Sequence, residues 1–424
     1  MTPEVMMGPP LAVGFALAVL AQRKGWAPPL WLALCAGAAL RVLAMLLAPQ
    51  MAVQPYDFEH DFRDAANAVL DGLNPTMHLR EGGWHFLPLL AYVLAGQQEL
   101  GETLGLSWAV AGRIVPIVAD LALIPLISRL ATERGALRGF QYACLPVGVL
   151  VSGLHGQFPP ITLLFGVAAL LAARRGRVQL AGLLIGLSVS CTHWSLLLVP
   201  GVVLAVPGLR RRVTVLVWTA VAPLAMLASS AVFLDTAVSE LPALVRAIMS
   251  TRPVVGDWGW TAVATGGEQM VSPAFGRTGL VILAAALLAA LWWWRRAEPE
   301  VLTLALLLVF LIVTYRLGAQ YLLWPLPYLL ARPPRRAWAA ITATSLWVVV
   351  GYLHLLYFMA GLEWGVAHRL WVLSSLVVIA ALVCGLPWRE RGPLTTGPAT
   401  GADETGPRPA EHAAQKGRGA PSRR

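Results

Sequence analysis

Long apolar runs, separated by short polar breaks, occupy most of the chain. The runs lie near residues 7–21, 29–48, 109–130, 139–154, 158–173, 179–193, 194–208, 213–234, 279–294, 301–315, 319–331, 337–358 and 368–387. A transmembrane helix needs about 20 predominantly apolar residues, and several runs have that length. The pattern predicts an all-α polytopic membrane protein with about 11 to 13 transmembrane helices.

The polar breaks alternate between two kinds. One kind is rich in arginine and occurs at residues 23–24, 134–138, 174–177, 210–212, 295–296, 332–336 and in the tail after residue 388. The other kind is poor in arginine and comprises residues 49–108, 155–157, 235–278, 315–320 and 359–367. Because cytoplasmic loops carry an excess of positive charge, we expect the first kind inside the cell and the second kind outside.

Composition supports this interpretation and excludes other classes. Of 424 residues, 57% are hydrophobic and only 13% are charged, against about a quarter charged in soluble domains. The net charge of +10 is spread over short loops and the tail, so it predicts no nucleic-acid partner. We expect one multi-pass domain over residues 1–387 in the cell membrane. Residues 388–424, rich in Pro, Gly and Arg, should form a disordered cytoplasmic tail.

The four cysteines give no sign of a metal or disulfide site. They lie in apolar stretches, and none has C-x-x-C spacing: Cys35, Cys144, Cys191 and Cys384. Small core side chains are the simplest interpretation. Inside the apolar runs, Arg113 and Asp120 lie two helical turns apart on one face, where they could pair with neighbouring helices.

The first long outward loop, residues 49–108, holds the densest group of acids. Asp64 fits the cap of an amphipathic helix that begins at Ala65. Asp57, Glu59 and Asp61 suit a general base that accepts a proton from a hydroxyl nucleophile. Asp57 and Glu59 could instead hold a divalent cation through their oxygens, and a solvated loop is the third alternative.

Several sequence blocks follow one another in a specific order over about residues 50–330. They are Asp57 to Gly72, Asn74-Pro75, Leu87 to Tyr92, Ala119 to Leu123, His155-Gly156-Gln157-Phe158, Leu180 to Leu187 and Ala319 to Pro327. These blocks resemble those of GT-C-fold glycosyltransferases that use polyprenyl-phosphate sugars. The resemblance is greatest to bacterial mannosyltransferases that use polyprenyl-phosphate mannose and to the enzyme that adds the first mannose of GPI anchors. The resemblance implies a GT-C-type bundle with interfacial helices in the first outward loop.

The resemblance also implies roles for the acids. The family places an acidic pair, often D-x-D, in the first outward loop as the source of the catalytic base. Asp57-Phe58-Glu59 matches as D-x-E, and Glu59-His60-Asp61 matches as E-x-D. We rank Asp57 first, Glu59 second and Asp61 third. The chain departs from the family at Pro159-Pro160, where many relatives carry an acid, and at His193-Trp194, where they often carry lysine.

A polyprenyl-phosphate leaving group needs cationic or hydrogen-bonding partners near the outer leaflet. The candidates for binding the donor phosphate are Arg316, Gln320, His193 and Arg252, although arginines at membrane interfaces can also simply snorkel. Trp258 and Trp260 in loop 235–278 could stack on an acceptor sugar or anchor the loop in the interface. His78 and Gln157 complete the candidates for acceptor binding.

These features predict an inverting membrane glycosyltransferase. It would move a hexose, with mannose as first candidate, from a polyprenyl phosphate to a hydroxyl acceptor on the extracytoplasmic face. The acceptor could be a glycan, a lipid or a secreted metabolite. The expected reaction requires no cofactor, although a divalent cation could take part. A transporter or flippase of a lipid-linked sugar, or a catalytically inactive membrane scaffold, is the alternative.

Overall fold

The computed structural model describes residues 2–51, 54–79, 84–249, 259–266, 272–314, 318–354 and 364–388. Within these ranges the regular structure is entirely helical, and no strand occurs in them, which confirms the all-α prediction for this part of the chain.

The α-helices fall into the following order along the chain: α1 (Pro3–Lys24), α2 (Leu30–Leu47), α3 (Arg63–Leu70), α4 (Pro75–His78), α5 (Leu89–Leu104), α6 (Trp108–Leu130), α7 (Gly135–Cys144), α8 (Pro146–Gly148), α9 (Pro159–Arg174), α10 (Val178–Cys191), α11 (Val199–Leu204), α12 (Leu209–Phe233), α13 (Leu241–Met249), α14 (Gly259–Ala264), α15 (Pro273–Trp294), α16 (Pro299–Val313), α17 (Leu326–Ala331), α18 (Ala337–Val349) and α20 (Trp364–Gly385). Short helices of other types link or extend them: the π-helical turns η2 (Asp57–Phe62), η3 (Val149–His155) and η7 (Val350–His354), and the 3-10 turns η1 (Ala48–Gln50), η4 (His193–Leu197), η5 (Val238–Glu240) and η6 (Ala319–Leu323).

Length and composition indicate which helices could cross a membrane. Among the described residues, five helices are long and apolar enough to cross a membrane: Val5–Lys24, Leu30–Gln50, Trp108–Leu130, Leu209–Phe233 and Pro273–Trp294. The bent pair Gly135–Cys144 and Pro146–His155 makes a sixth if it counts as one span. Six further apolar helices of 10–17 residues are shorter than a full span. By length and composition, five or six helices in the described part of the chain could therefore cross a membrane, whereas the sequence predicted 11 to 13 spans for the whole chain.

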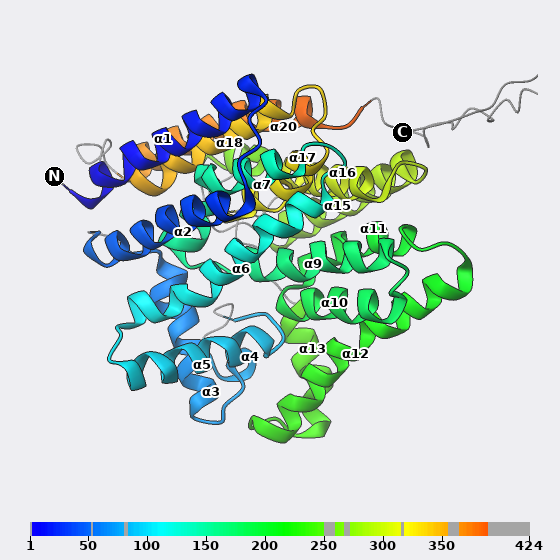
Figure 1. Cartoon of the computed structure of the whole chain (residues 1–424). Coiled ribbons are helices and arrows are strands. Elements are labelled where there is room, and N and C mark those ends of the chain that lie inside the picture. The colour runs from blue at the N-terminus through cyan, green and yellow to red at the C-terminus, as the bar shows by residue number, and fades with distance from the viewer. Residues whose placement is uncertain are drawn as a thin grey trace, which may run out of the picture.

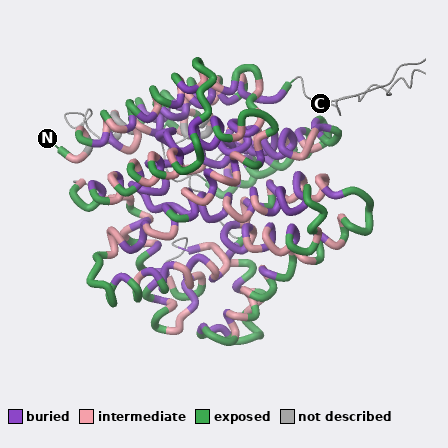
Figure 2. The backbone as a smooth tube through the Cα atoms, viewed as in Figure 1, coloured by how far each residue is buried: buried purple, intermediate pink, exposed green. Residues whose placement is uncertain are grey.

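The surface of the bundle fits a lipid environment. Large apolar side chains are exposed along its outer helices, such as Leu224 on α12 at 61% and Val281 on α15 at 67%. Figure 2 shows buried residues concentrated inside the bundle, with exposed positions along its outer helices. Soluble monomers rarely expose apolar area on this scale, so these faces suit contact with acyl chains.

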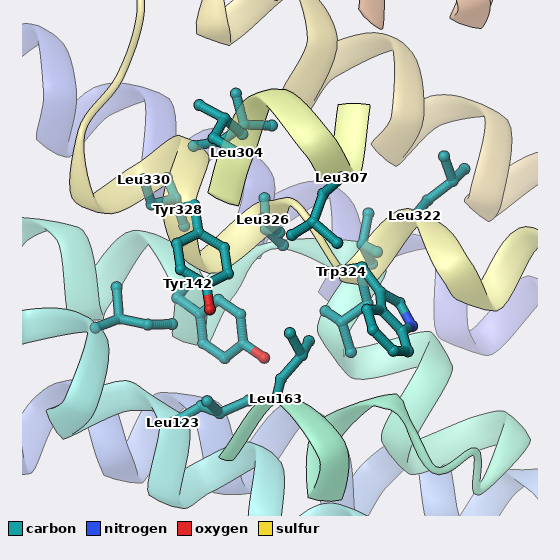
Figure 3. Close-up of a cluster of buried hydrophobic side chains, with 14 of the residues drawn as sticks. Leu123, Tyr142, Leu163, Leu304, Leu307, Leu322, Trp324, Leu326, Tyr328 and Leu330 are labelled. Carbon is teal, nitrogen blue, oxygen red and sulfur yellow. The ribbon is translucent and has the colours of Figure 1, made fainter. Parts of the chain in front are cut away.

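The interior is packed by side chains from distant parts of the sequence. Leu123 of α6, Tyr142 of α7 and Leu163 of α9 lie close to Leu307 of α16 and Tyr328 of α17 (Figure 3). All five are buried. Because lipid tails are as apolar as leucine, close packing and interhelical hydrogen bonds hold such a bundle together.

One break in the bundle brings a polar turn to the site described below. The apolar run 139–154, expected as one segment, is interrupted where α7 ends, and the two halves are bent by 51°. Pro146 opens α8, and Leu145 before it is extended, with ψ of 134°. Proline disfavours helical backbone in the residue that precedes it, which accounts for the break. The second half continues through η3 and ends at His155.

Contacts at or beside the polar breaks occur at two ends of the described part of the molecule. Helices α3, α4 and α5 cluster at one end with α13 nearby (Figure 1). There the two long arginine-poor loops meet: the backbone N–H of Asp235 donates to the carbonyl of Gly72 at 2.7 Å, and Asn74 Nδ2 donates to Thr236 Oγ1 at 2.9 Å. Arginine-rich breaks meet one another at the far end of α6, where Arg174 contacts both Leu130 and Glu300. That the first end faces outside the cell stays a prediction.

Candidate functional site

The turn η2 carries Asp57 and is fixed to α6 by the residue that follows. Phe58 is fully buried, and its ring stacks on Trp108 at a centroid distance of 5.5 Å. Trp108 Nε1 also donates to the carbonyl of Phe58 at 3.1 Å, while the Arg113 guanidinium lies 3.9 Å from the centroid of the Phe58 ring. An acid next to such an anchored residue has little freedom to move.

Two side chains, one from the last residue of η3 and one from the turn after it, hold the Asp57 carboxylate. His155 Nε2 lies 2.7 Å from Oδ1, and Gln157 Nε2 donates to Oδ2. Gly156 between them has φ of +76°, which a side chain would strain. A Cβ added to Gly156 would also lie 2.7 Å from the Phe58 ring. The sequence His-Gly-Gln therefore lets both polar side chains reach one carboxylate while the backbone packs against Phe58.

On the side away from Asp57, His155 contacts Tyr352 from the C-terminal part of the chain. The hydroxyl of Tyr352, on η7, lies 2.5 Å from Nδ1 of His155. A neutral imidazole with its proton on Nε2 satisfies both contacts, because Nε2–H donates to Asp57 and Nδ1 accepts from the tyrosine hydroxyl. Asp57, His155 and Tyr352 thus form one chain of hydrogen bonds.

The exposure and the charge of Asp57 allow its carboxylate to accept a proton from a bound substrate. The Asp57 side chain is 31% exposed, whereas that of His155 is 8% exposed. Burial raises the pKa of the Asp57 carboxyl, but the His155 imidazole and the Phe58 backbone N–H lower it, and the net pKa lies below the ordinary value of 3.8. Asp57 is therefore ionised at neutral pH.

A small cavity adjoins Gln157 and collects other predicted residues. Its volume is about 30 Å³, and its lining includes Phe86, Gln157, Thr192 and Gln320. His193 stacks on Phe86 with ring centroids 6.3 Å apart. Asp57, Gln157, Gln320 and His193, selected from separate sequence blocks, thus converge on one region. The cavity has room for about one water molecule, so a sugar phosphate would enter only if its walls moved apart.

The other acids of the first loop lie differently. Glu59 lines a separate groove with Arg63 and Glu102, away from the contacts of Asp57. Side chains two positions apart on a helix do not face each other, which explains the separation. Asp61 lies half-buried on the same turn. Within the described ranges, no three His, Cys, Asp or Glu side chains gather in a group that could hold a metal ion.

The remaining candidates lie elsewhere or outside the described residues. His78 on α4 contacts the Asn74 carbonyl at 3.1 Å, and its Nε2 lies 4.0 Å from Asp235 Oδ2. Trp260 on α14 donates to the Val313 carbonyl at 2.9 Å, at the end of α16. The described contacts join neither residue to Asp57. Arg252, Trp258 and Arg316 lie outside the described residues.

A buried polar network positions η3 from inside the bundle. Arg41 of α2 and Asp120 of α6 are fully buried and form an ion pair, with Nε 2.6 Å from Oδ2. Ser152 of η3 donates to the same oxygen at 2.8 Å, and the Tyr142 hydroxyl donates to Oδ1. Ser152 lies three residues before His155, so this network fixes the helical turn that carries the histidine.

Sequence reasoning found part of this site. It selected Asp57 and Gln157, but gave no role to His155 or Tyr352. The adjacency of His155 to Gln157 was the available signal, because a histidine in an outward polar turn is a ready partner for an acid. Tyr352 lies 197 residues from His155, beyond the blocks that carry the resemblance, so no spacing rule could join them.

The assembled site is an ionised, partly exposed carboxylate held by an imidazole and an amide, next to a small cavity with polar and aromatic walls. Such a carboxylate can accept a proton from a hydroxyl group. No known protein-family model matches the chain, and no curated protein matches it at a significant level.

Proposed function

We propose that the chain is an inverting membrane glycosyltransferase of the GT-C type. It transfers a hexose, with mannose as the first candidate, from a polyprenyl-phosphate donor to a hydroxyl acceptor on the extracytoplasmic face. The observation that carries the proposal is the Asp57 carboxylate, which is ionised, partly exposed and oriented by His155 and Gln157. The resemblance in sequence supplies the reaction class.

Asp57 acts as the general base. The acceptor hydroxyl gives its proton to the free lone pairs of Asp57 while its oxygen forms a bond to the anomeric carbon. The bond from that carbon to the phosphate oxygen breaks on the opposite face, and the electron pair leaves with the polyprenyl phosphate. The hydroxyl becomes strongly acidic as its new bond forms, so a carboxylate of low pKa suffices as the base.

The leaving phosphate gains charge and needs donors near the cavity. The Gln320 amide lines the cavity, and His193 borders it through Phe86. Both side chains can donate hydrogen bonds to a phosphate oxygen. We assign Arg316 the same role, because it precedes Gln320 by four residues in the sequence. The hydrophobic helix faces would hold the polyprenyl tail in the lipid.

One observation favours the alternative of a transporter for a lipid-linked sugar. The Arg41–Asp120 pair lies fully buried in the bundle, and charges at such positions often serve transport. However, both oxygens of Asp120 already accept hydrogen bonds from protein groups. A structural pair of this kind fits an enzyme equally well, and the Asp57 site supports transfer as the first proposal.

A transfer assay in proteoliposomes tests the proposal. The donor is radiolabelled polyprenyl-phosphate mannose, with the glucose analogue in parallel, and the acceptors are short mannosides and lipid-linked glycans. Asp57→Asn should lower the rate at least about 100-fold, the usual contribution of a general base. Asp64→Asn is the matched control, because Asp64 is an exposed acid on α3, and it should keep the wild-type rate.

Two results would overturn the proposal. One is a rate for Asp57→Asn equal to that of the wild type. The other is a wild-type protein that transfers neither sugar but moves the lipid-linked sugar across the bilayer, which would establish the transporter.

A further inference from the structure

A second opening lies beside η2, where α3, α5 and α6 meet it. This groove has a volume of about 420 Å³, and its lining includes Glu59, Arg63, Gln98, Glu102, Ser107 and Trp108. That volume lies within the range of small-molecule sites, whereas the cavity beside Gln157 holds only about 30 Å³. The groove can therefore accommodate a ligand of about the size of a sugar ring.

One polar group in the groove lacks a hydrogen-bond partner. Gln98 Nε2 donates to Asn67 Oδ1 at 2.7 Å and to Glu102 Oε1 at 3.2 Å, which fixes the orientation of the amide. The other end of that amide, Oε1, is buried and accepts no hydrogen bond within the described part of the chain. A buried acceptor without a donor costs stability, and a ligand hydroxyl would satisfy it if the Gln98 side chain turned its Oε1 toward the groove.

The charges of the groove select the kind of ligand. Glu59 and Glu102 disfavour an anion, and Arg63 disfavours a cation. The charge of Glu59 interacts with that of Arg113. No ion pair among the described residues engages Glu59 or Arg63, so both keep hydrogen-bonding capacity for a ligand. Carboxylates, an amide and a guanidinium together match the closely spaced hydroxyls of a neutral sugar, and the indole of Trp108 offers an apolar surface for its C–H groups.

The groove is connected to the turn that carries Asp57. Trp108 lines the groove, stacks on Phe58 and donates to its carbonyl. Glu59 also lines the groove and lies only two residues after Asp57. A ligand bound in the groove would thus contact η2, the same turn that positions Asp57.

We propose that this groove binds a sugar unit of the acceptor, remote from the hydroxyl that is glycosylated. The identity of this ligand as part of the acceptor rests on the proposed function. The acceptor would then be a glycan or a glycosylated lipid, and neither a lipid without sugar nor a small secreted metabolite.

Binding of methyl α-mannoside and of mannobiose to the full-length protein in detergent tests the groove, with saturation-transfer NMR as the readout. Gln98→Leu and Glu102→Leu should each weaken binding about tenfold, which corresponds to one lost hydrogen bond. Glu99→Leu is the matched control on α5, because Glu99 does not line the groove, and it should bind as the wild type does. Asp57→Asn should also bind normally.

Transfer kinetics provide the second readout. With a mannobiose acceptor, the two groove variants should raise KM about tenfold and change kcat less than about twofold, because the groove holds the substrate equally before and in the transition state. Wild-type binding in both variants, or no binding of either sugar to the wild type, would overturn the proposal that the groove binds a sugar. Neither result would change the test of Asp57 as the general base. Sugar binding that depends on Gln98 in a protein without transferase activity would uphold the groove and overturn the proposed function.

Discussion

At the scale of single residues, the site depends on three side chains from distant parts of the chain. Asp57 comes from the first loop, His155 from the end of η3, and Tyr352 from the C-terminal part. The sequence predicted the acid, because carboxylates are scarce in this chain and cluster in one loop. The residue pattern alone left three acids open, and only the resemblance ranked Asp57 first, because the choice depends on which acid faces His155 and Gln157.

The lowered pKa of Asp57 predicts how stability changes with pH. A carboxyl with a pKa below its ordinary value of 3.8 stabilises the fold above that pH, and this contribution is lost as the pH falls through the lowered pKa. In thermal unfolding in detergent, the wild type should be more stable than Asp57→Asn by a constant amount from pH 8 to about pH 4. Below that pH the difference in stability should shrink. A stability difference that disappears between pH 7 and pH 5 would contradict the ionised state assigned to Asp57.

Gly156 should resist substitution because of its surroundings. Gly156→Ala places a methyl group 2.7 Å from the Phe58 ring and strains a backbone with φ of +76°, so it should lower stability by about 1–3 kcal/mol. It should also lower the transfer rate, because His155 and Gln157 flank the glycine. Gly176 has φ of +71° and open space around it, so Gly176→Ala isolates the cost of backbone strain. Equal transfer rates in the two variants would argue against the close approach to Phe58.

At the scale of elements, proline and buried charge shape the turns that carry the site. Residues 139–154 read as one apolar segment by hydropathy, but Pro146 breaks it into α7 and the bent continuation α8 and η3. The hydropathy pattern predicted neither the break nor the direction of the bend, although Pro146 is the residue that causes the break. That direction is fixed by Ser152 on Asp120 and by the packing of Gly153 against the backbone of Arg41.

The Arg41–Asp120 pair should show strong coupling in a double-mutant cycle. Asp120→Leu leaves Arg41 as an unpaired buried charge, so we expect a loss of about 3–5 kcal/mol in the free energy of unfolding. Replacing both residues with leucine should cost less than the sum of the two single changes, by at least about 1 kcal/mol. Unfolding of the four proteins in detergent measures this difference, and additive losses would show that the pair does not act as a unit.

At the scale of the whole molecule, the chain places its two long arginine-poor loops together at one end. The contacts Asp235 with Gly72 and Asn74 with Thr236 join them, and Asp57 belongs to the first of these two loops. Charge alternation predicted that these two loops lie on one side, because arginine-rich and arginine-poor breaks are expected on opposite sides of a membrane. It could not predict that η7, from the C-terminal helices, would complete the site, since only tertiary packing brings Tyr352 to His155.

The stereochemistry of a single turnover tests the central claim most directly. A donor of defined anomeric configuration, labelled with ¹³C at the anomeric carbon, is supplied in proteoliposomes to the wild type and to Asp57→Asn, and the product is analysed by NMR. We predict a product of the opposite anomeric configuration from the wild type, formed at least about 100-fold more slowly by Asp57→Asn. A product that keeps the configuration of the donor, or equal rates from the two proteins, would contradict the assignment of Asp57 as the base of an inverting transfer.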